Sequence, residues 1–124
     1  MPFAYERDDI HRRVVVTWTG AFDGADVIDL LHRQREDGTW SYGLLLDTRV
    51  LVGYPTIGEL RRFMQLESET DSKQRPRGPL VLVATDIGLY VAACAYAMLG
   101  TSQRKIQVFR NYDEAHLWLT AQSA

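Results

Sequence analysis

The sequence predicts one α/β domain spanning residues 1–124: a mixed, mostly parallel five-stranded sheet with four helices, in the order ββαβαβαβα. Three observations lead to this prediction. The chain has 124 residues, the length of one compact domain. Short apolar and β-branched runs alternate with segments of helical periodicity. Such alternation is typical of parallel strands joined by right-handed helical crossovers.

The first two strands are expected to form a hairpin over residues 3–19. Phe3, Tyr5 and Arg7 alternate with other residues, as in a short strand. The segment 14–19 is rich in β-branched residues and stops at Gly20, which predicts a strong strand. Asp8 and Asp9 between them predict the turn.

The first helix is expected to open at Asp23-Gly24 and to stop at Gly38. Its apolar positions, Val27, Leu30 and Leu31, have the spacing i, i+3, i+4 of one helix face. The following segment, Tyr42–Asp47, is almost continuously apolar, which predicts a strand buried on both faces.

A capping box predicts the start of the second helix, because Thr56 and Glu59 are three residues apart. Ile57, Leu60 and Met64 would form its buried stripe. The charged segment 67–78 is interpreted as the helix end followed by a loop.

The last third of the chain predicts strand, helix, strand and helix in turn. The strands are 80–84 and 106–109, and an apolar helix over 87–99 lies between them, closed by Gly100. Asn111 is expected to cap the final helix. The buried face of that helix would consist of Ala115, Trp118 and Leu119.

Composition argues against several classes of protein. The net charge of −2 argues against nucleic-acid binding, and a single cysteine cannot form an internal disulfide. Early charges at the N-terminus argue against a signal peptide. The apolar stretch 79–100 is broken at 85–88, which leaves too few residues to span a bilayer. We therefore expect a cytoplasmic protein without membrane insertion.

No motif in the sequence points to catalysis. The chain has no G-x-S-x-G, no P-loop and no G-x-G-x-x-G pattern. His11, His32 and His116 lie on separate predicted elements without metal-ligand spacing. Cys94 lies inside an apolar helix, where a thiol usually only packs. We expect no enzyme activity, no cofactor and no metal site.

The order and spacing of three segments resemble the STAS superfamily of bacterial anti-sigma-factor antagonists, and in particular its uncharacterised SpoIIAA-like or STAS/Sec14-like branch. The resemblance covers nearly the whole chain. It is carried by Trp40–Arg49, by Arg77–Ala84, and by Val108–Arg110 followed by Glu114–Leu119. It implies a non-catalytic module that binds partner proteins. A related branch of this fold group binds lipids or small apolar molecules.

The resemblance also implies a role for Thr56. In the antagonists, a serine or threonine at the start of the second helix is phosphorylated by a partner kinase, and this switches binding. That place carries an Asp-Ser-Ser-Gly-like run in the antagonists and Tyr54-Pro55-Thr56-Ile57 in this chain. The alternative interpretation is that Thr56 is simply the helix cap, with Glu59 completing the box.

Polar residues follow three of the predicted parallel strands, and the ends of such strands meet at one edge of a sheet. Helices start at the same edge, and helix N-termini attract anions. One interpretation is a site for a small anion or phosphorylated group held by Arg49 or Arg110. The other is that Asp86 caps a helix and the arginines pair locally or with solvent. The candidate residues of this edge are Asp47, Thr48, Arg49, Asp86 and Arg110.

The helix 87–99 is apolar on almost every side, although a helix on one face of a sheet needs only one apolar stripe. Either neighbouring helices cover the surplus, or it forms a partner surface, with a homodimer as the commonest arrangement. The candidate interface residues are Tyr90, Cys94 and Tyr96.

Two functions from different classes follow. The first is a regulatory or protein-interaction module without catalysis. The second is a carrier or sensor for a small apolar or anionic ligand, using a cleft beside Thr56 and Asp86. An apolar cavity in the structure would favour the second function, whereas a filled core with an exposed apolar helix would favour the first.

Overall fold

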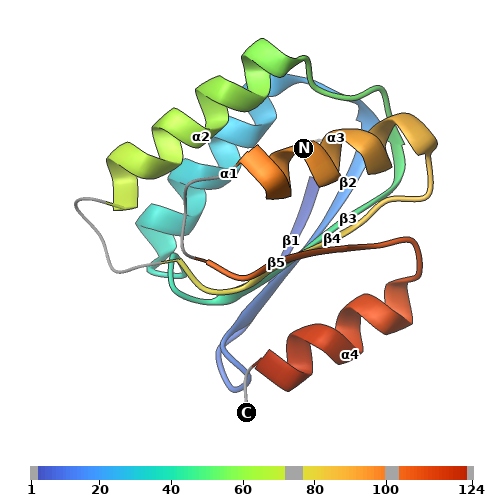
Figure 1. Cartoon of the computed structure of the whole chain (residues 1–124). Coiled ribbons are helices and arrows are strands. Elements are labelled where there is room, and N and C mark those ends of the chain that lie inside the picture. Colours follow the sequence, from blue (N-terminus) through green and yellow to red (C-terminus); the bar gives the residue numbers. More distant parts are fainter. Residues whose placement is uncertain (1–2, 72–76, 100–103, 123–124) are drawn as a thin grey trace.

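The computed structural model describes residues 3–71, 77–99 and 104–122 (Figure 1). These residues form one five-stranded sheet and four helices in the order ββαβαβαβα, which confirms the predicted fold class. The elements are β1 Phe3–Asp8, β2 Arg13–Ala21, α1 Gly24–Asp37, β3 Gly43–Val52, α2 Ile57–Asp71, β4 Leu80–Val83, α3 Ile87–Leu99, β5 Ile106–Phe109 and α4 Tyr112–Gln122.

The strands lie in the sheet in their order along the chain, β1-β2-β3-β4-β5. β1 and β2 are antiparallel, as predicted for the hairpin, and every later pair is parallel. Each helical crossover after β2 therefore leads to the neighbouring strand, always in the same direction across the sheet. Right-handed crossovers in one direction place their helices on one face of a sheet. α1, α2 and α3 accordingly cover one face, and α4 covers the other (Figure 1).

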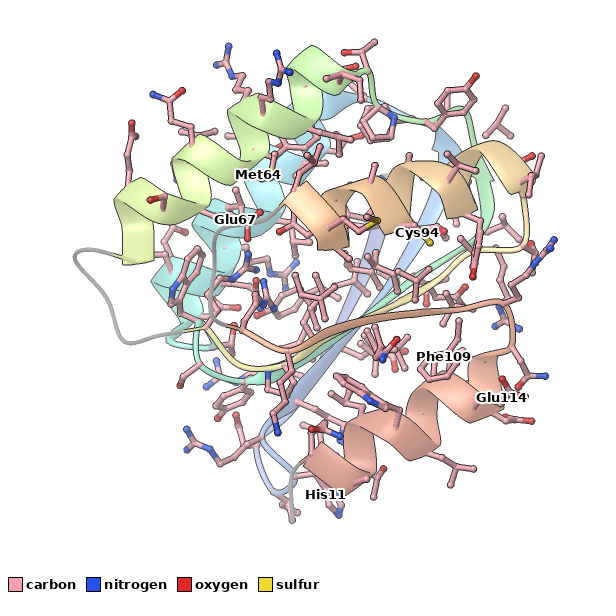
Figure 2. All side chains as sticks on the ribbon, in the orientation of Figure 1. His11, Met64, Glu67, Cys94, Phe109 and Glu114 are labelled. Atoms are coloured by element: carbon pink, nitrogen blue, oxygen red, sulfur yellow. The ribbon has the colours of Figure 1, made fainter. Side chains whose placement is uncertain are left out.

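The sheet separates two apolar clusters because successive strand residues point to opposite faces. Leu44 and Leu80, which are register partners, belong to the larger cluster beneath α1, α2 and α3. Leu45 and Val81, the next pair, belong to the smaller cluster with Leu119 of α4. Figure 2 shows Phe109 at the end of β5 on the side of α4. Both faces of the central strands are therefore buried, as the apolar runs predicted.

Helix ends agree with the predicted capping residues. The Asp23 carboxylate accepts from the backbone N–H of Ala25 at 3.0 Å, and Gly38 ends α1 in the left-handed conformation with φ +73°. Thr56 and Glu59 form the reciprocal capping box, each side chain accepting from the other's backbone N–H at 3.1 Å. Most of the predicted element boundaries thus follow from local hydrogen bonding.

The third strand is longer than predicted. The sequence predicted its end at Asp47, whereas β3 continues to Val52. Asp47 pairs with the last residue of β4, Val83, so beyond it β3 keeps only β2 as a neighbour. In this extension Arg49, Val50 and Val52 are exposed, whereas Leu51 is buried in the larger cluster. The continuous apolar pattern therefore stops before the strand does.

The buried stripe of α2 also differs from the prediction. Leu60 is buried as expected, but Ile57 is 51% exposed and Met64 only half-buried. Phe63 and Glu67 complete the stripe at 5% and 6% exposure. The predicted helix end within 67–78 agrees with α2, which continues to Asp71, and most of the loop predicted after it lies outside the described residues. The predicted helix stop at Gly100 also lies outside them.

Candidate functional site

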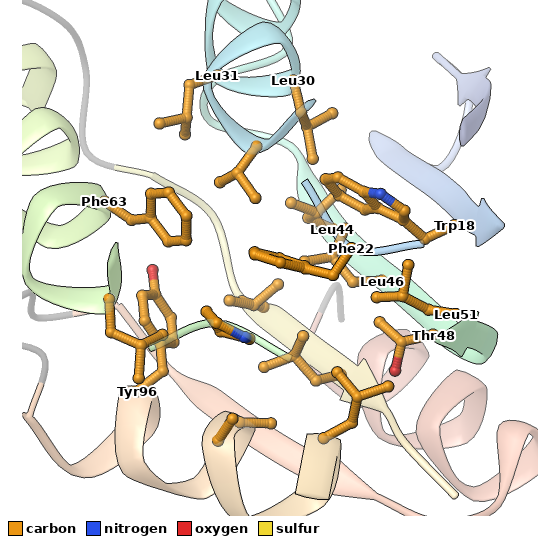
Figure 3. Close-up of a pocket in the computed structure, with 18 of the residues that line it drawn as sticks. Trp18, Phe22, Leu30, Leu31, Leu44, Leu46, Thr48, Leu51, Phe63 and Tyr96 are labelled. Atoms are coloured by element: carbon orange, nitrogen blue, oxygen red, sulfur yellow. The ribbon is translucent and has the colours of Figure 1, made fainter. Parts of the chain in front are cut away.

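A cavity of about 130 Å³ lies between the sheet and the three helices that cover its larger cluster (Figure 3). Three strands and three helices contribute to its wall. One lining residue from each is Trp18 of β2, Leu44 of β3, Leu82 of β4, Leu30 of α1, Phe63 of α2 and Ala92 of α3. The cavity is about half enclosed, so it is a pocket in the wall of the core that opens to the surface.

Small side chains on α3 explain why the space is left open. The lining residues of this helix include Ala92 and Ala93, which reach only a short way toward the sheet. The larger rings of Phe22 and Phe63 also line the cavity, with centroids 6.4 Å apart. A buried water needs two to four polar partners, and this wall is almost entirely apolar. The cavity is therefore suited to apolar matter.

The charged side chains of the wall and the Tyr96 hydroxyl are held in a buried network. Arg77 donates through Nη1 to the Glu67 carboxylate and through Nη2 to Gln34 Oε1 at 2.8 Å. Tyr96 donates its hydroxyl to the other oxygen of Glu67. The Arg77 guanidinium also lies 4.3 Å from the centre of the Trp40 ring. The network connects α1, α2 and α3 at one part of the cavity wall.

Burial raises the pKa of Tyr96 above its usual value near 10, and the negative charge of Glu67 raises it further. The phenol therefore stays protonated and keeps donating to Glu67. Arg104 approaches the same carboxylate, with Nη1 3.5 Å from Glu67 Oε2. Glu67 is consequently a buried carboxylate stabilised by a phenol and by guanidinium groups, which is the environment that a buried charge requires.

Sequence reasoning assigned Glu67 to a charged helix end and did not single out Arg77. One signal was present, because Leu60, Phe63 and Glu67 have the spacing i, i+3, i+7 of one helix face. A carboxylate on an apolar helix face predicts a buried partner. The identity of that partner could not be read, because Arg77 lies ten residues away and Tyr96 lies on another helix.

No family model and no curated protein matches this chain. A solved structure does match: an uncharacterised protein of the DUF3478 family with a SpoIIAA-like fold, from Shewanella loihica PV-4. The match has a TM-score of 0.61 and covers 94% of this chain and 91% of that chain. The chain has the SpoIIAA-like fold. At 12% identity the likeness shows the fold alone, and this is the fold that the sequence resemblance predicted.

In this SpoIIAA-like fold, the residues predicted for the anion-binding edge engage local partners. Asp47 is buried and accepts from Arg49 through Nε at 2.9 Å and Nη2 at 2.8 Å. Thr48 donates to the Val83 carbonyl at 2.7 Å. The Arg49 guanidinium also lies 4.8 Å from the centre of the Tyr112 ring. These contacts are those of a local ion pair, and the anion site stays a prediction.

The remaining candidates of this edge also have local roles in the SpoIIAA-like fold. Asp86 caps α3 by accepting from the Leu89 backbone N–H at 3.1 Å. Arg110 donates to the Thr85 carbonyl at 2.8 Å. Thr56 caps α2, and a phosphoryl group there stays a prediction. Of the edge residues, Thr48 also lines the cavity, together with Pro55 beside Thr56.

The predicted interface helix presents different residues inward and outward. Tyr96 lines the cavity and binds Glu67, whereas Tyr90 is half-buried beneath the Arg110 guanidinium at 5.6 Å from its ring centre. Cys94 is half-buried on α3 (Figure 2). The exposed apolar side chains of this helix are Ile87, Val91, Met98 and Leu99.

The three histidines lie apart in the SpoIIAA-like fold. His11 contacts Asp8, His32 contacts Arg35 and His116 contacts Arg13. Within residues 3–71, 77–99 and 104–122, no three His, Cys, Asp or Glu side chains gather as metal ligands. Within the same ranges, no helix is both long and apolar enough to cross a bilayer.

Proposed function

We propose that this protein is a non-catalytic carrier or sensor that binds a small apolar molecule between its sheet and the helices α1, α2 and α3. The observation that carries this proposal is the 130 Å³ cavity with its almost entirely apolar wall. Of the two functions that the sequence left open, the cavity favours ligand binding. It lies deeper than the predicted cleft at the sheet edge and reaches that edge through Thr48 and Pro55.

That this apolar cavity is left unfilled by side chains supports a role for it in binding. The cavity is about half enclosed, so when it is empty its almost entirely apolar wall stays in contact with water, which is unfavourable. A larger side chain at Ala92 or Ala93 would fill part of the space. A ligand that replaces the missing contacts recovers stability in the same way.

The chemistry of the wall supports binding without catalysis. Its hydroxyl groups are engaged, Thr48 with the Val83 carbonyl and Tyr96 with Glu67. The raised pKa of Tyr96 keeps that phenol protonated at neutral pH. The resemblance to the STAS superfamily likewise implies a module that acts by binding.

Native mass spectrometry of the protein purified from its own cells tests this proposal. We expect a non-covalent extra mass that is lost on denaturation. The variant Ala92→Leu should lack this mass because leucine would occupy the cavity. The matched control is Ala95→Leu, on the same helix but outside the cavity wall. A bare wild-type protein that also binds no added apolar compound would contradict the proposal.

The exposed apolar side chains of α3 favour a second candidate function, self-association through this helix. Ile87 and Val91 are 65% and 59% exposed, and α3 carries no charged residue. A second copy of the chain would present the same uncharged surface, as a two-fold interface requires. We expect Val91→Glu to abolish a dimer that Leu117→Glu, on the exposed side of α4, leaves intact. A wild-type monomer at high concentration in analytical ultracentrifugation would contradict this candidate.

A further inference from the structure

We infer that the ligand of this cavity is a compact, uncharged ring compound, aromatic or alicyclic, and that fatty acids and other charged amphiphiles are excluded. This inference rests on the proposed function and narrows its ligand to one chemical class. Three features of the cavity lead to it: its volume, the pairing of its charges and the aromatic side chains in its wall.

The volume limits the size of the ligand. An engineered cavity of about 150 Å³ lined by apolar residues stays dry and binds benzene. The cavity between the sheet and the helices measures about 130 Å³ and is also lined by apolar side chains. It therefore holds a molecule with roughly six to eight non-hydrogen atoms. A long acyl chain needs several times that space and would extend through the open side of the cavity into water, which is unfavourable.

The charges in the wall oppose a charged ligand. The charged lining residues are Glu67 and Arg77, and they are bonded to each other. Arg77 also donates to Gln34 and lies against Trp40. Among the described residues, the wall keeps two buried N–H groups without a hydrogen-bond partner, Arg77 Nε and Trp18 Nε1. A ligand carboxylate beside Arg77 would lie near the Glu67 carboxylate, and two like charges at one buried site repel each other, so the wall favours neutral molecules.

The aromatic residues of the wall favour a ring over a flexible chain. Four aromatic side chains line the cavity (Figure 3). They are Trp18 of β2, Phe22 directly after β2, Phe63 of α2 and Tyr96 of α3. The rings of Phe22 and Phe63 are tilted by 58° to each other, with centroids 6.4 Å apart. Aromatic pairs gain from offset and edge-to-face contacts beyond their buried area. A flat ring between these side chains makes such contacts with several of them.

A matched set of small molecules tests the inference by NMR titration and thermal unfolding of the full chain. Toluene and benzoate share a six-membered ring and differ in charge, and decanoate adds a long chain. We expect toluene to shift the resonances of cavity residues and to raise the unfolding temperature. Benzoate should bind at least about tenfold more weakly, because its carboxylate would be buried near that of Glu67. Decanoate should not bind in the cavity.

Variants show whether toluene binds in the cavity itself. Ala92→Leu should abolish toluene binding and Ala95→Leu should preserve it. Ala93→Leu is a second filling variant that serves if Ala92→Leu does not fold. Binding of toluene that survives both filling variants would overturn the inference.

The two proposals fail separately in this experiment. Benzoate or decanoate binding in the cavity as tightly as toluene would overturn the neutral-ring inference and leave the apolar-carrier function standing. If none of the three compounds binds, and the protein from its own cells carries no extra mass, both proposals are wrong.

Discussion

Glu67 shows how one residue can be both costly and necessary. A buried carboxylate is unfavourable unless it is paired and fully hydrogen-bonded. Glu67 meets this condition through Arg77 and Tyr96, which come from other parts of the chain. Pairs of this kind contribute little net stability, but removal of one partner leaves the other buried and uncompensated. The network therefore holds α2 and α3 in one relative position beside the cavity.

Replacement of Glu67 tests this role. We expect Glu67→Ala to lower the free energy of unfolding by about 3–5 kcal/mol, because Arg77 would remain charged and buried. The exposed Glu36→Ala on α1 should stay within about 0.5 kcal/mol of wild type. Urea unfolding followed by circular dichroism measures both. Equal stabilities of the two variants would show that the network is not important for folding.

Tyr96 gives the stability a dependence on pH. Its raised folded-state pKa means that the unfolded chain loses this proton first, near pH 10. The unfolded state then binds fewer protons, so the free energy of unfolding falls by up to about 1.4 kcal/mol per pH unit above that point. We expect Tyr96→Phe to lose part of this fall and the exposed Tyr54→Phe to keep it. Urea unfolding of both variants between about pH 8 and pH 11 measures this fall in the free energy of unfolding. An identical fall in the two variants would show that Tyr96 is not its cause.

At the scale of elements, the entry into β4 depends on a close approach between two chain segments. Gly78 lies against the backbone that leads into β3. A Cβ on Gly78 would lie 2.4 Å from the Tyr42 carbonyl oxygen and 2.5 Å from that of Ser41. Backbone atoms cannot move aside as a flexible side chain can. Glycine at this position therefore lets β4 enter the sheet beside β3, and it follows directly on Arg77.

Alanine substitutions at two glycines compare this contact with an ordinary helical site. We expect Gly78→Ala to destabilise the fold by more than about 2 kcal/mol, since β3 or β4 would have to shift. Gly58→Ala should stabilise it by about 0.4–1 kcal/mol, because this helical site has space for a Cβ. Thermal unfolding of the two variants checks both signs. A Gly78→Ala variant as stable as the wild type would mean that the backbone at Gly78 and the backbone at Ser41 and Tyr42 can move apart without cost.

At the scale of the whole molecule, the two faces of the sheet are covered unequally. Among the described residues, three helices share one face and leave a cavity there, whereas only α4 covers the other face. Leu119 of α4 is fully buried against Leu45, Val81 and Val83. The smaller cluster is therefore covered by one short helix, α4, and the face with the cavity is covered by the other three helices.

Two leucines of α4 test this division. We expect Leu119→Ala to destabilise the whole domain by about 2–5 kcal/mol, because it opens a void in the smaller cluster. Leu117→Ala should change stability by less than about 0.5 kcal/mol, because this side chain is 70% exposed. Differential scanning calorimetry distinguishes them, and a single transition is expected for both variants. A transition of α4 alone would show that this helix is not part of the cooperative unit.

The sequence by itself determined the elements and their order. Strands, capping boxes and helix stops are local features, since each depends on residues within a few positions of one another. The fold class, the hairpin and the caps at Asp23, Gly38 and Thr56 were predicted for this reason. The resemblance to the SpoIIAA-like fold also depended on the order and spacing of short segments.

Only the tertiary structure decided the strand order, the full length of β3 and the candidate site. The Glu67 network joins residues from three helices and a loop, and the cavity wall joins six elements. No local pattern specifies how far a side chain reaches across such a space. A cavity is the volume that side chains from distant segments fail to fill together, and it exists only when all of those segments are in place.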